Sequence, residues 1–136
     1  EMSGHIFFAE DWYGFDDAIV AAARLLRILS RHHGDAVDYF SRFPVLCTTP
    51  EINITVTEEN KFRIIEYLQE RIDFGDGERT VLDGIRMDYG DGWGLCRASN
   101  TSPKLVTRYE ATDPQALARI QTRFENAIDE AIKAVG

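Results

Sequence analysis

Cysteines, basic clusters and long apolar runs are scarce in this sequence, and each scarcity excludes a class of protein. Only two cysteines, Cys47 and Cys96, occur among 136 residues, which is too few for the disulfide framework of a small secreted protein. We expect both to be free thiols that pack as small core residues, which fits a cytoplasmic protein. The longest apolar-rich stretch, Ala18–Leu29, is interrupted by Arg24 and Arg27, so no membrane span is expected.

The charge balance is strongly acidic. Because 15 Lys and Arg stand against 23 Asp and Glu, the formal net charge is -8. No run of basic residues interleaved with aromatics offsets this charge, so we expect no nucleic-acid partner. A small phosphorylated ligand is still compatible with the acidity, because one positioned Arg with several N–H and O–H donors decides such binding locally.

The first third of the chain contains one short strand pattern and one clear helix pattern. Ile6–Ala9 is an apolar run suited to a strand. A capping aspartate at position 16 or 17 is followed by apolar residues at three- and four-residue steps up to Leu29, which predicts an amphipathic helix. A second, short helix is expected within Asp35–Arg42. Two prolines then interrupt regular structure, and we place a domain boundary near Thr48.

The remaining residues show the order strand, helix, several strands, helix. After Thr57, which can cap a helix, the apolar face is expected to carry Phe62, Ile65, Leu68 and Ile72. Asp113 and Pro114 supply the N-cap and first position of a final helix. Asp-Gly steps mark hairpin turns between short strands. The expected strands are Ile52–Val56, Thr80–Leu82, Ile85–Tyr89, Trp93–Ala98 and Lys104–Ala111.

This order favours an α+β fold with a mostly antiparallel sheet and helices on one face. Consecutive short strands pair through hairpins, and two amphipathic helices need one apolar sheet face to cover. We therefore expect residues 48–136 to form one such domain and residues 1–47 to form a separate segment before it.

The segment Arg97–Pro103, between two expected strands, concentrates hydrogen-bond donors. It contains a guanidinium, the hydroxyls of Ser99, Thr101 and Ser102, and the amide of Asn100. An Arg forms a two-pronged charged pair with a phosphate, while hydroxyls and turn N–H groups satisfy the remaining oxygens. The same residues also suit a polar hairpin loop whose Ser and Asn side chains bond their own backbone.

A second polar segment, Glu1–His5, precedes the first expected strand. The carboxylate of Glu1, the hydroxyl of Ser3 and the imidazole of His5 lie within five residues, and such groups hydrogen-bond neighbouring sugar hydroxyls. A frayed terminus is the alternative interpretation. Because the chain begins without Met, we interpret it as part of a longer protein.

Together the two segments resemble the α-D-phosphohexomutase family, in which a Gly-Glu-Met-Ser-Gly-His loop reads the sugar and an Arg-x-Ser-Asn-Thr-x-Pro loop holds phosphate. The match covers Glu1–His5, which lacks only the first Gly, and Arg97–Pro103. Asp83-Gly-Ile-Arg86 and Gly90-Asp-Gly-Trp-Gly94 also look like this family. Met2 and the Ser-Asn-Thr loop resemble its phosphomannomutase/phosphoglucomutase branch, whereas phosphoglucosamine mutases typically have Gln and Arg-Pro-Ser-Gly-Thr.

The resemblance implies a fold and a role for each of these residues. Residues 48–136 would be the C-terminal, phosphate-binding domain 4 with a TATA-binding-protein-like fold, and residues 1–47 the end of the sugar-binding α/β domain 3. Glu1 and Ser3 would bind the 3- and 4-hydroxyls of the hexose, and His5 would lie near the reacting end as an acid/base neighbour. The distal phosphate of a mannose or glucose phosphate would be held by Arg97, Ser99, Asn100 and Thr101.

The resemblance also implies what this chain lacks. The family's phosphoserine lies in a Ser-His-Asn-Pro loop and its Mg²⁺ site in an Asp-Gly-Asp-x-Asp loop, and neither motif occurs in the sequence. The implied parent enzyme uses both in its missing N-terminal domains, with a hexose 1,6-bisphosphate activator, to interconvert hexose 1- and 6-phosphates. We therefore expect no catalytic residue and no metal ligand here, and an inactive isolated chain. A phosphoglucosamine mutase fragment and a non-catalytic binding module are the alternatives.

Overall fold

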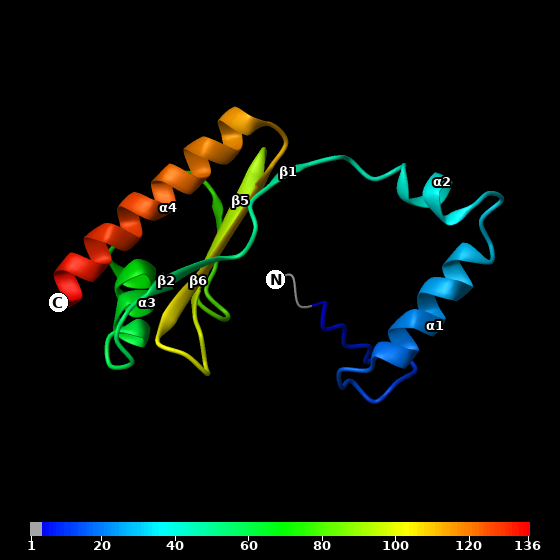
Figure 1. The fold of residues 1–136 in the computed structure, drawn as a ribbon, viewed down its shortest axis with the longest axis horizontal. Helices are drawn as coiled ribbons and strands as arrows, with labels where there is room; N and C mark the ends of the chain where they lie inside the picture. Colours follow the sequence, from blue (N-terminus) through cyan, green and yellow to red (C-terminus); the bar gives the residue numbers. More distant parts are fainter. Residues whose placement is uncertain (1–3) are drawn as a thin grey trace. The chain divides into compact units, whose positions relative to one another are not determined.

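The computed structural model describes residues 4–136, and the chain divides into two units, residues 1–44 and 45–136 (Figure 1). The helices within the described range are α1 (Ala18–Leu29), α2 (Ala36–Phe40), α3 (Lys61–Glu70) and α4 (Pro114–Val135). The strands within it are β1 (Cys47–Thr48), β2 (Ile52–Thr55), β3 (Glu78–Thr80), β4 (Ile85–Tyr89), β5 (Gly92–Ala98) and β6 (Lys104–Ala111).

Local capping starts both helices of the first unit. The Asp17 carboxylate accepts two hydrogen bonds of 3.0 Å from N–H groups in the first turn of α1, and Asp35 caps α2 with a hydrogen bond of 2.8 Å. Both helices were expected from the sequence. The expected strand at Ile6–Ala9 is wrong, because the only pairing described there is an isolated bridge between Phe7 and Asp16.

The first unit builds no core of its own among its described residues. None of the side chains in residues 4–44 is buried. On α1, Ile19 is 83% exposed and Leu26 is 66% exposed, although both belong to the apolar stripe that the sequence predicted. An amphipathic helix normally buries such a stripe. Residues 4–44 therefore do not by themselves cover the apolar face of α1.

The second unit contains one antiparallel sheet. Its strand order is β1–β6–β5–β4–β3, and β2 pairs with β6 as well. β1 pairs with residues 110–111 and β2 with residues 104–107, so the two short strands lie end to end along one side of β6. The described pairs are all antiparallel, which confirms the predicted α+β class with an antiparallel sheet.

Helices α3 and α4 pack against one face of this sheet (Figure 1). Along β5 the buried residues are Gly94, Cys96 and Ala98, at every second position, as the pleat requires. Phe124 of α4 lies directly over Gly94, where an added Cβ would be 2.5 Å from the ring. Arg97 is out of phase with this buried series and therefore lies on the opposite face of the sheet.

The core between helices and sheet is continuous. It contains Ile64, Ile65 and Leu68 from α3, buried residues from along α4 and alternate residues of the central strands. The fully enclosed members, with at most 2% of the side chain exposed, include Ile64, Leu68, Ile85, Met87, Cys96, Leu105, Tyr109, Ala111, Ile120, Phe124, Ile128 and Ala131. All of them belong to residues 45–136.

Within residues 45–136 the structure corrects two further details of the sequence-based prediction. The strand expected at Thr80–Leu82 is β3, which ends at Thr80, and Leu82 is 94% exposed. On α3, Phe62 was expected to face the core but is 56% exposed, and Lys61 is buried with the stripe instead. The helix begins at Lys61, so positions 61, 64, 65 and 68 share its inner face and Phe62 is rotated about 100° away.

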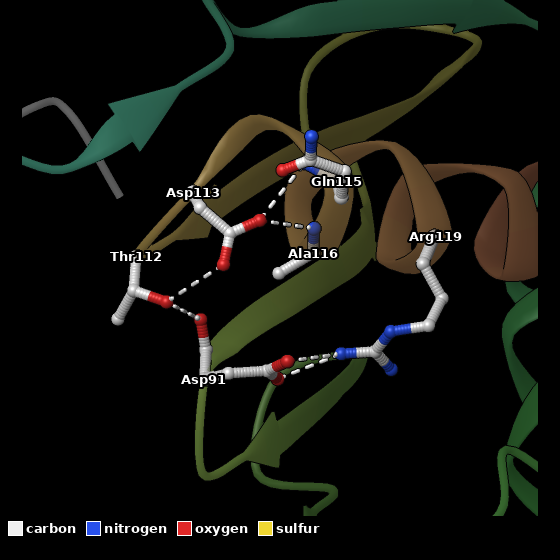
Figure 2. Close-up of polar contacts among 6 residues, drawn as sticks. All are labelled: Asp91, Thr112, Asp113, Gln115, Ala116 and Arg119. Carbon is white, nitrogen blue, oxygen red and sulfur yellow. Dashed lines mark hydrogen bonds and ion pairs between the residues drawn. The ribbon is translucent and has the colours of Figure 1, made fainter.

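The turn before β5 and the start of α4 form a polar corner (Figure 2). Asp113 accepts hydrogen bonds of 2.9 Å from the N–H groups of Gln115 and Ala116, which confirms the predicted N-cap. The Thr112 hydroxyl donates to the Asp91 carbonyl at 3.3 Å. Arg119 contacts both carboxylate oxygens of Asp91 at 2.7 and 2.6 Å. This corner lies at the opposite end of β5 from Arg97.

No helix in residues 4–136 is long and apolar enough to cross a lipid bilayer.

Cys96 is expected to resist thiol reagents in the folded chain. It is fully buried on the helix side of β5, and burial raises the pKa of its thiol to about 12. At pH 8 the thiolate that reacts is therefore almost absent. We expect a colorimetric thiol assay at pH 8 to titrate no more than the half-buried Cys47 in native protein and both thiols in guanidinium chloride. Rapid reaction of two thiols in the native chain would contradict the buried placement.

Residues 45–136 are expected to fold without residues 1–44, because every buried side chain described lies in this range. Cys47 pairs with Ala111, so the excised chain should begin at Val45 rather than inside β1. We expect a well-dispersed proton NMR spectrum from residues 45–136. An undispersed spectrum from residues 45–136, alongside a dispersed one from the 136-residue chain, would contradict this expectation.

Candidate functional site

The β5–β6 loop, residues 99–103, connects the two longest strands of the sheet. Ala98 and Leu105 are the last register pair of these strands before the loop. The Ser99 N–H donates to the Lys104 carbonyl at 2.9 Å, and the Lys104 N–H donates to the Ser102 carbonyl at 2.8 Å. The loop is thus closed by backbone hydrogen bonds at its base.

Two members of the predicted phosphate-binding set are partly enclosed. Arg97 occupies the end of β5, 19% of its side chain is exposed, and its Nη1 lies 3.7 Å from Oδ2 of Asp83. Ser99 is 7% exposed, and its Oγ accepts a hydrogen bond of 3.4 Å from the Thr101 N–H. The hydroxyl of Ser99 therefore shapes the loop, as the alternative interpretation of a self-bonded polar turn expected.

Asn100 and Thr101 are exposed at the tip of the loop. The four predicted residues thus lie within five consecutive positions at one end of the sheet. A cation at the strand end and two solvent-facing polar side chains beside it can receive an anion from solution. The arrangement suits binding, and it contains no nucleophile paired with a general base.

The connection between β3 and β4 packs against Arg97. Gly84 has a φ of +85°, and a Cβ added to it would lie 2.2 Å from the Cys96 carbonyl oxygen and 2.7 Å from the Arg97 Cα. The Gln69 side-chain amide donates to the Gly84 carbonyl at 2.6 Å and ties this connection to α3. Only glycine fits there, and its close approach brings the Asp83 carboxylate to the guanidinium.

The sequence analysis missed two contributions to this site. Asp83 and Gly84 were interpreted as a hairpin turn and as part of a family-like motif, with no role at the phosphate site, although the Asp-Gly step was a signal for a special backbone conformation. Lys61 was missed because a charged residue was assumed to face solvent. It is 1% exposed, and its Nζ lies 3.4 Å from the Ser102 carbonyl oxygen.

The predicted sugar-binding set is only partly described. Glu1 and Ser3 lie outside the described residues. His5 is exposed in the first unit, and its Nδ1 contacts the Asp16 carboxylate.

The family model for the C-terminal domain of phosphoglucomutase/phosphomannomutase matches residues 51–127, which include the sheet from β2 onward and the β5–β6 loop. The chain belongs to the phosphoglucomutase/phosphomannomutase family. The match covers more than half of the chain and includes the loop that the resemblance of Arg97–Pro103 had singled out.

Several members of this family resemble the chain over nearly its whole length. It is 58% identical over 128 residues to the phosphomannomutase/phosphoglucomutase of Pseudomonas aeruginosa PAO1, covering 94% of this chain and 28% of that protein. It is 46% identical over 131 residues to a phosphoglucomutase of Neisseria gonorrhoeae, covering 95% of this chain and 28% of that protein. A probable phosphoglucosamine mutase of Methanocella arvoryzae is 28% identical over 134 residues, covering 97% of this chain and 30% of that protein.

A crystal structure of the family has the same fold. The phosphoglucomutase/phosphomannomutase family protein of Burkholderia thailandensis aligns with a TM-score of 0.78 and 43% sequence identity, covering 96% of this chain and 27% of that one. The chain therefore spans little more than a quarter of the length of these relatives and corresponds to a C-terminal part of a phosphohexomutase.

Proposed function

We propose that the full-length protein is a phosphomannomutase/phosphoglucomutase, which interconverts hexose 1-phosphate and hexose 6-phosphate, and that this chain supplies sugar and phosphate recognition. The observation that carries the proposal is the end of β5 together with the β5–β6 loop, where a guanidinium, hydroxyls and an amide come from Arg97, Ser99, Asn100 and Thr101. The greater identity to phosphomannomutase/phosphoglucomutase than to phosphoglucosamine mutase supports this branch.

The proposed reaction explains why a separate phosphate grip is needed. A phosphoserine elsewhere in the full-length protein gives its phosphoryl group to the free hydroxyl of the hexose phosphate. The serine–phosphorus bond breaks, the new sugar–phosphorus bond forms, and the hydroxyl proton passes to a base. The bisphosphate then turns round, and its other phosphoryl group returns to the serine. In each half-reaction one phosphate does not react, and holding it orients the reacting end.

The same proposal assigns the rest of the chain. Residues 1–47 would be the end of the sugar-binding domain, with Glu1 and Ser3 at the 3- and 4-hydroxyls and His5 near the reacting end. Residues 48–136 would be the phosphate-binding domain. The division of the structure into units after Pro44 and the start of the family match at residue 51 support a boundary in this region. The free thiols Cys47 and Cys96 support a cytoplasmic location.

The residues that the structure describes do not fit a magnesium site. Among residues 4–136 no group of three or more His, Cys, Asp or Glu side chains is placed to hold a metal ion. In the acidic turn that follows α3, the Asp73 carboxylate accepts a hydrogen bond of 2.8 Å from the Gly75 N–H and so stabilises the turn. We assign the binding of Mg²⁺ and of the hexose 1,6-bisphosphate activator to the full-length enzyme.

Steady-state kinetics of the full-length protein test the proposal. With Mg²⁺ and glucose 1,6-bisphosphate present, we expect conversion of glucose 1-phosphate and mannose 1-phosphate at least about tenfold more efficient than conversion of glucosamine 1-phosphate. The 136-residue chain serves as the control without the phosphoserine motif and is expected to convert none. A preference for the glucosamine substrate would assign the protein to the other branch, and duplex DNA binding without any conversion would favour a binding module instead.

A further inference from the structure

Lys61 is a charged side chain enclosed by the protein. It occupies the first position of α3 and is 1% exposed. Burying an ammonium group is unfavourable unless the charge finds a partner and hydrogen-bond acceptors. The contacts of the Lys61 ammonium group therefore show what its burial achieves.

The ammonium group joins an acidic side chain to the β5–β6 loop. Its Nζ lies 2.6 Å from Oε1 of Glu58, whose side chain is 65% exposed. Nζ also lies 3.4 Å from the Ser102 carbonyl oxygen. Glu58 compensates the charge, whereas the contact with Ser102 links α3 to a loop 41 residues away in sequence.

The loop is also tied to the same connection through its backbone. The Val56 N–H donates to the Pro103 carbonyl at 3.1 Å, so the successive carbonyls of Ser102 and Pro103 are engaged by Lys61 at the start of α3 and by Val56 just after β2. The Ser102 carbonyl additionally accepts the Lys104 N–H at 2.8 Å. The second half of the loop is therefore anchored, while Asn100 and Thr101 at its tip stay exposed.

Phosphate binding by such a loop depends on the direction of its peptide groups. A phosphate needs N–H groups and hydroxyls, and a carbonyl oxygen turned toward it would repel it. The Lys61 ammonium group, 3.4 Å from the Ser102 carbonyl oxygen, favours an orientation of this carbonyl toward the start of α3. Sites held by such supporting contacts keep the geometry that binding requires.

We propose that Lys61 is a positioning residue for the phosphate-binding loop: its ammonium group fixes the Ser102 carbonyl and so presents Ser99–Thr101 to the substrate phosphate. This inference rests on the proposed function, because it assumes that the loop binds phosphate. Lys61 acts through the loop backbone and does not itself contact the substrate.

The test replaces Lys61 with an apolar side chain of similar length in the full-length enzyme. In Lys61→Met we expect the KM for glucose 1-phosphate to rise about fivefold while kcat changes less than about twofold. The reason is that contacts of the loop with the non-reacting phosphate are weakened equally in the ground state and in the transition state. Lys133→Met makes the same chemical change at an exposed position of α4 and should leave KM unchanged. A melting curve of each variant confirms that it is folded.

A second variant separates positioning from a merely structural role. Glu58→Gln removes the ion pair and keeps the ammonium group at Ser102, so it should lower the melting temperature while KM stays at the wild-type value.

If Lys61→Met does not fold, Lys61→Gln is measured in its place. Its shorter side chain also loses the contact with the Ser102 carbonyl, so about the same rise in KM is expected.

Arg97→Ala, measured beside these variants, distinguishes the assignment of the loop to phosphate from the positioning role of Lys61. If Arg97→Ala raises KM and the Lys61 variant has the wild-type KM, the positioning role of Lys61 is overturned. If neither variant changes KM, the assignment of the loop to phosphate fails, and the inference about Lys61 fails with it. A rise in both, with Glu58→Gln and Lys133→Met unchanged, supports the proposal.

Discussion

Arg97→Ala in the full-length enzyme is expected to lower kcat/KM for glucose 1-phosphate at least about tenfold, because charged hydrogen bonds of the lost kind contribute about 1.5 to 3 kcal/mol each. The guanidinium is the only cationic group within residues 97–103. The neighbouring hydroxyls and amide of the loop remain in the variant, so some phosphate binding should persist.

The fold should survive this substitution. Arg97 lies on the sheet face away from α3 and α4, and its ion pair with Asp83 spans 3.7 Å to a carboxylate whose side chain is 69% exposed. Ion pairs of this length with one solvent-exposed partner contribute about 1 kcal/mol or less, so loss of the pair with Asp83 should lower the melting temperature by no more than about 4 °C. The functional loss would then be attributable to binding rather than to unfolding.

Two further variants make the result specific. Arg97→Lys should recover only part of the efficiency, because it keeps the charge but loses the planar, two-pronged geometry that fits phosphate oxygens. Arg119→Ala removes a guanidinium from the corner at the other end of β5, where it pairs with Asp91, and should leave kcat/KM within about twofold of wild type. Equal values of kcat/KM for Arg97→Ala and wild type would contradict the assignment of this loop to phosphate binding.

The elements that depend on neighbouring residues were predictable from the sequence. Asp113 and Pro114 mark the start of α4, because an N-cap and a first-turn proline act on adjacent backbone groups. β4 and β6 have the predicted bounds, since alternating side chains and Asp-Gly turns are local signals. The position of the candidate loop follows from these strands, so the sequence alone places Ser99–Pro103 between β5 and β6 and Arg97 near the end of β5.

The support of the loop was not predictable, because it comes from residues distant in sequence. Val81 and Leu82 after Thr80 favoured a strand that continues to Leu82. The chain instead leaves the sheet after Thr80 and packs Gly84 against the backbone of β5. Helical periodicity likewise assigned Phe62 to the core. It did not indicate that the buried Lys61 ammonium group contacts the Ser102 carbonyl. Periodicity reports which face of an element is apolar, and it is silent on a polar contact made across the fold.

Gly84→Ala is expected to destabilise the protein by about 2 to 4 kcal/mol, since overpacking against backbone costs about 1 to 3 kcal/mol and a side chain at positive φ adds about 1 kcal/mol. The new Cβ would lie 2.2 Å from the Cys96 carbonyl oxygen and 2.7 Å from the Arg97 Cα, at a φ of +85°. Both atoms belong to the backbone of β5, the central strand of the sheet, so neither can move without disturbing the ladder.

The same substitution should also impair phosphate binding. Relief of the clash has to separate the β3–β4 connection from β5 at Arg97, which shifts the guanidinium and removes Asp83 from it. We therefore expect kcat/KM for glucose 1-phosphate to fall at least about tenfold in the fraction that remains folded. Urea unfolding at 25 °C and steady-state kinetics on the same preparation measure the two effects separately.

Gly90→Ala is the matched control for this prediction. Gly90 also has a positive φ, +24°, but nothing lies within 4 Å of the position where its Cβ would be. It occupies the hairpin at the end of β5 that is remote from Arg97, so its replacement should cost about 1 kcal/mol and leave kcat/KM unchanged. Because backbone strain is present in both variants and steric conflict with β5 only in Gly84→Ala, equal unfolding free energies for the two would show that Gly84 does not pack against Arg97 as the structure describes.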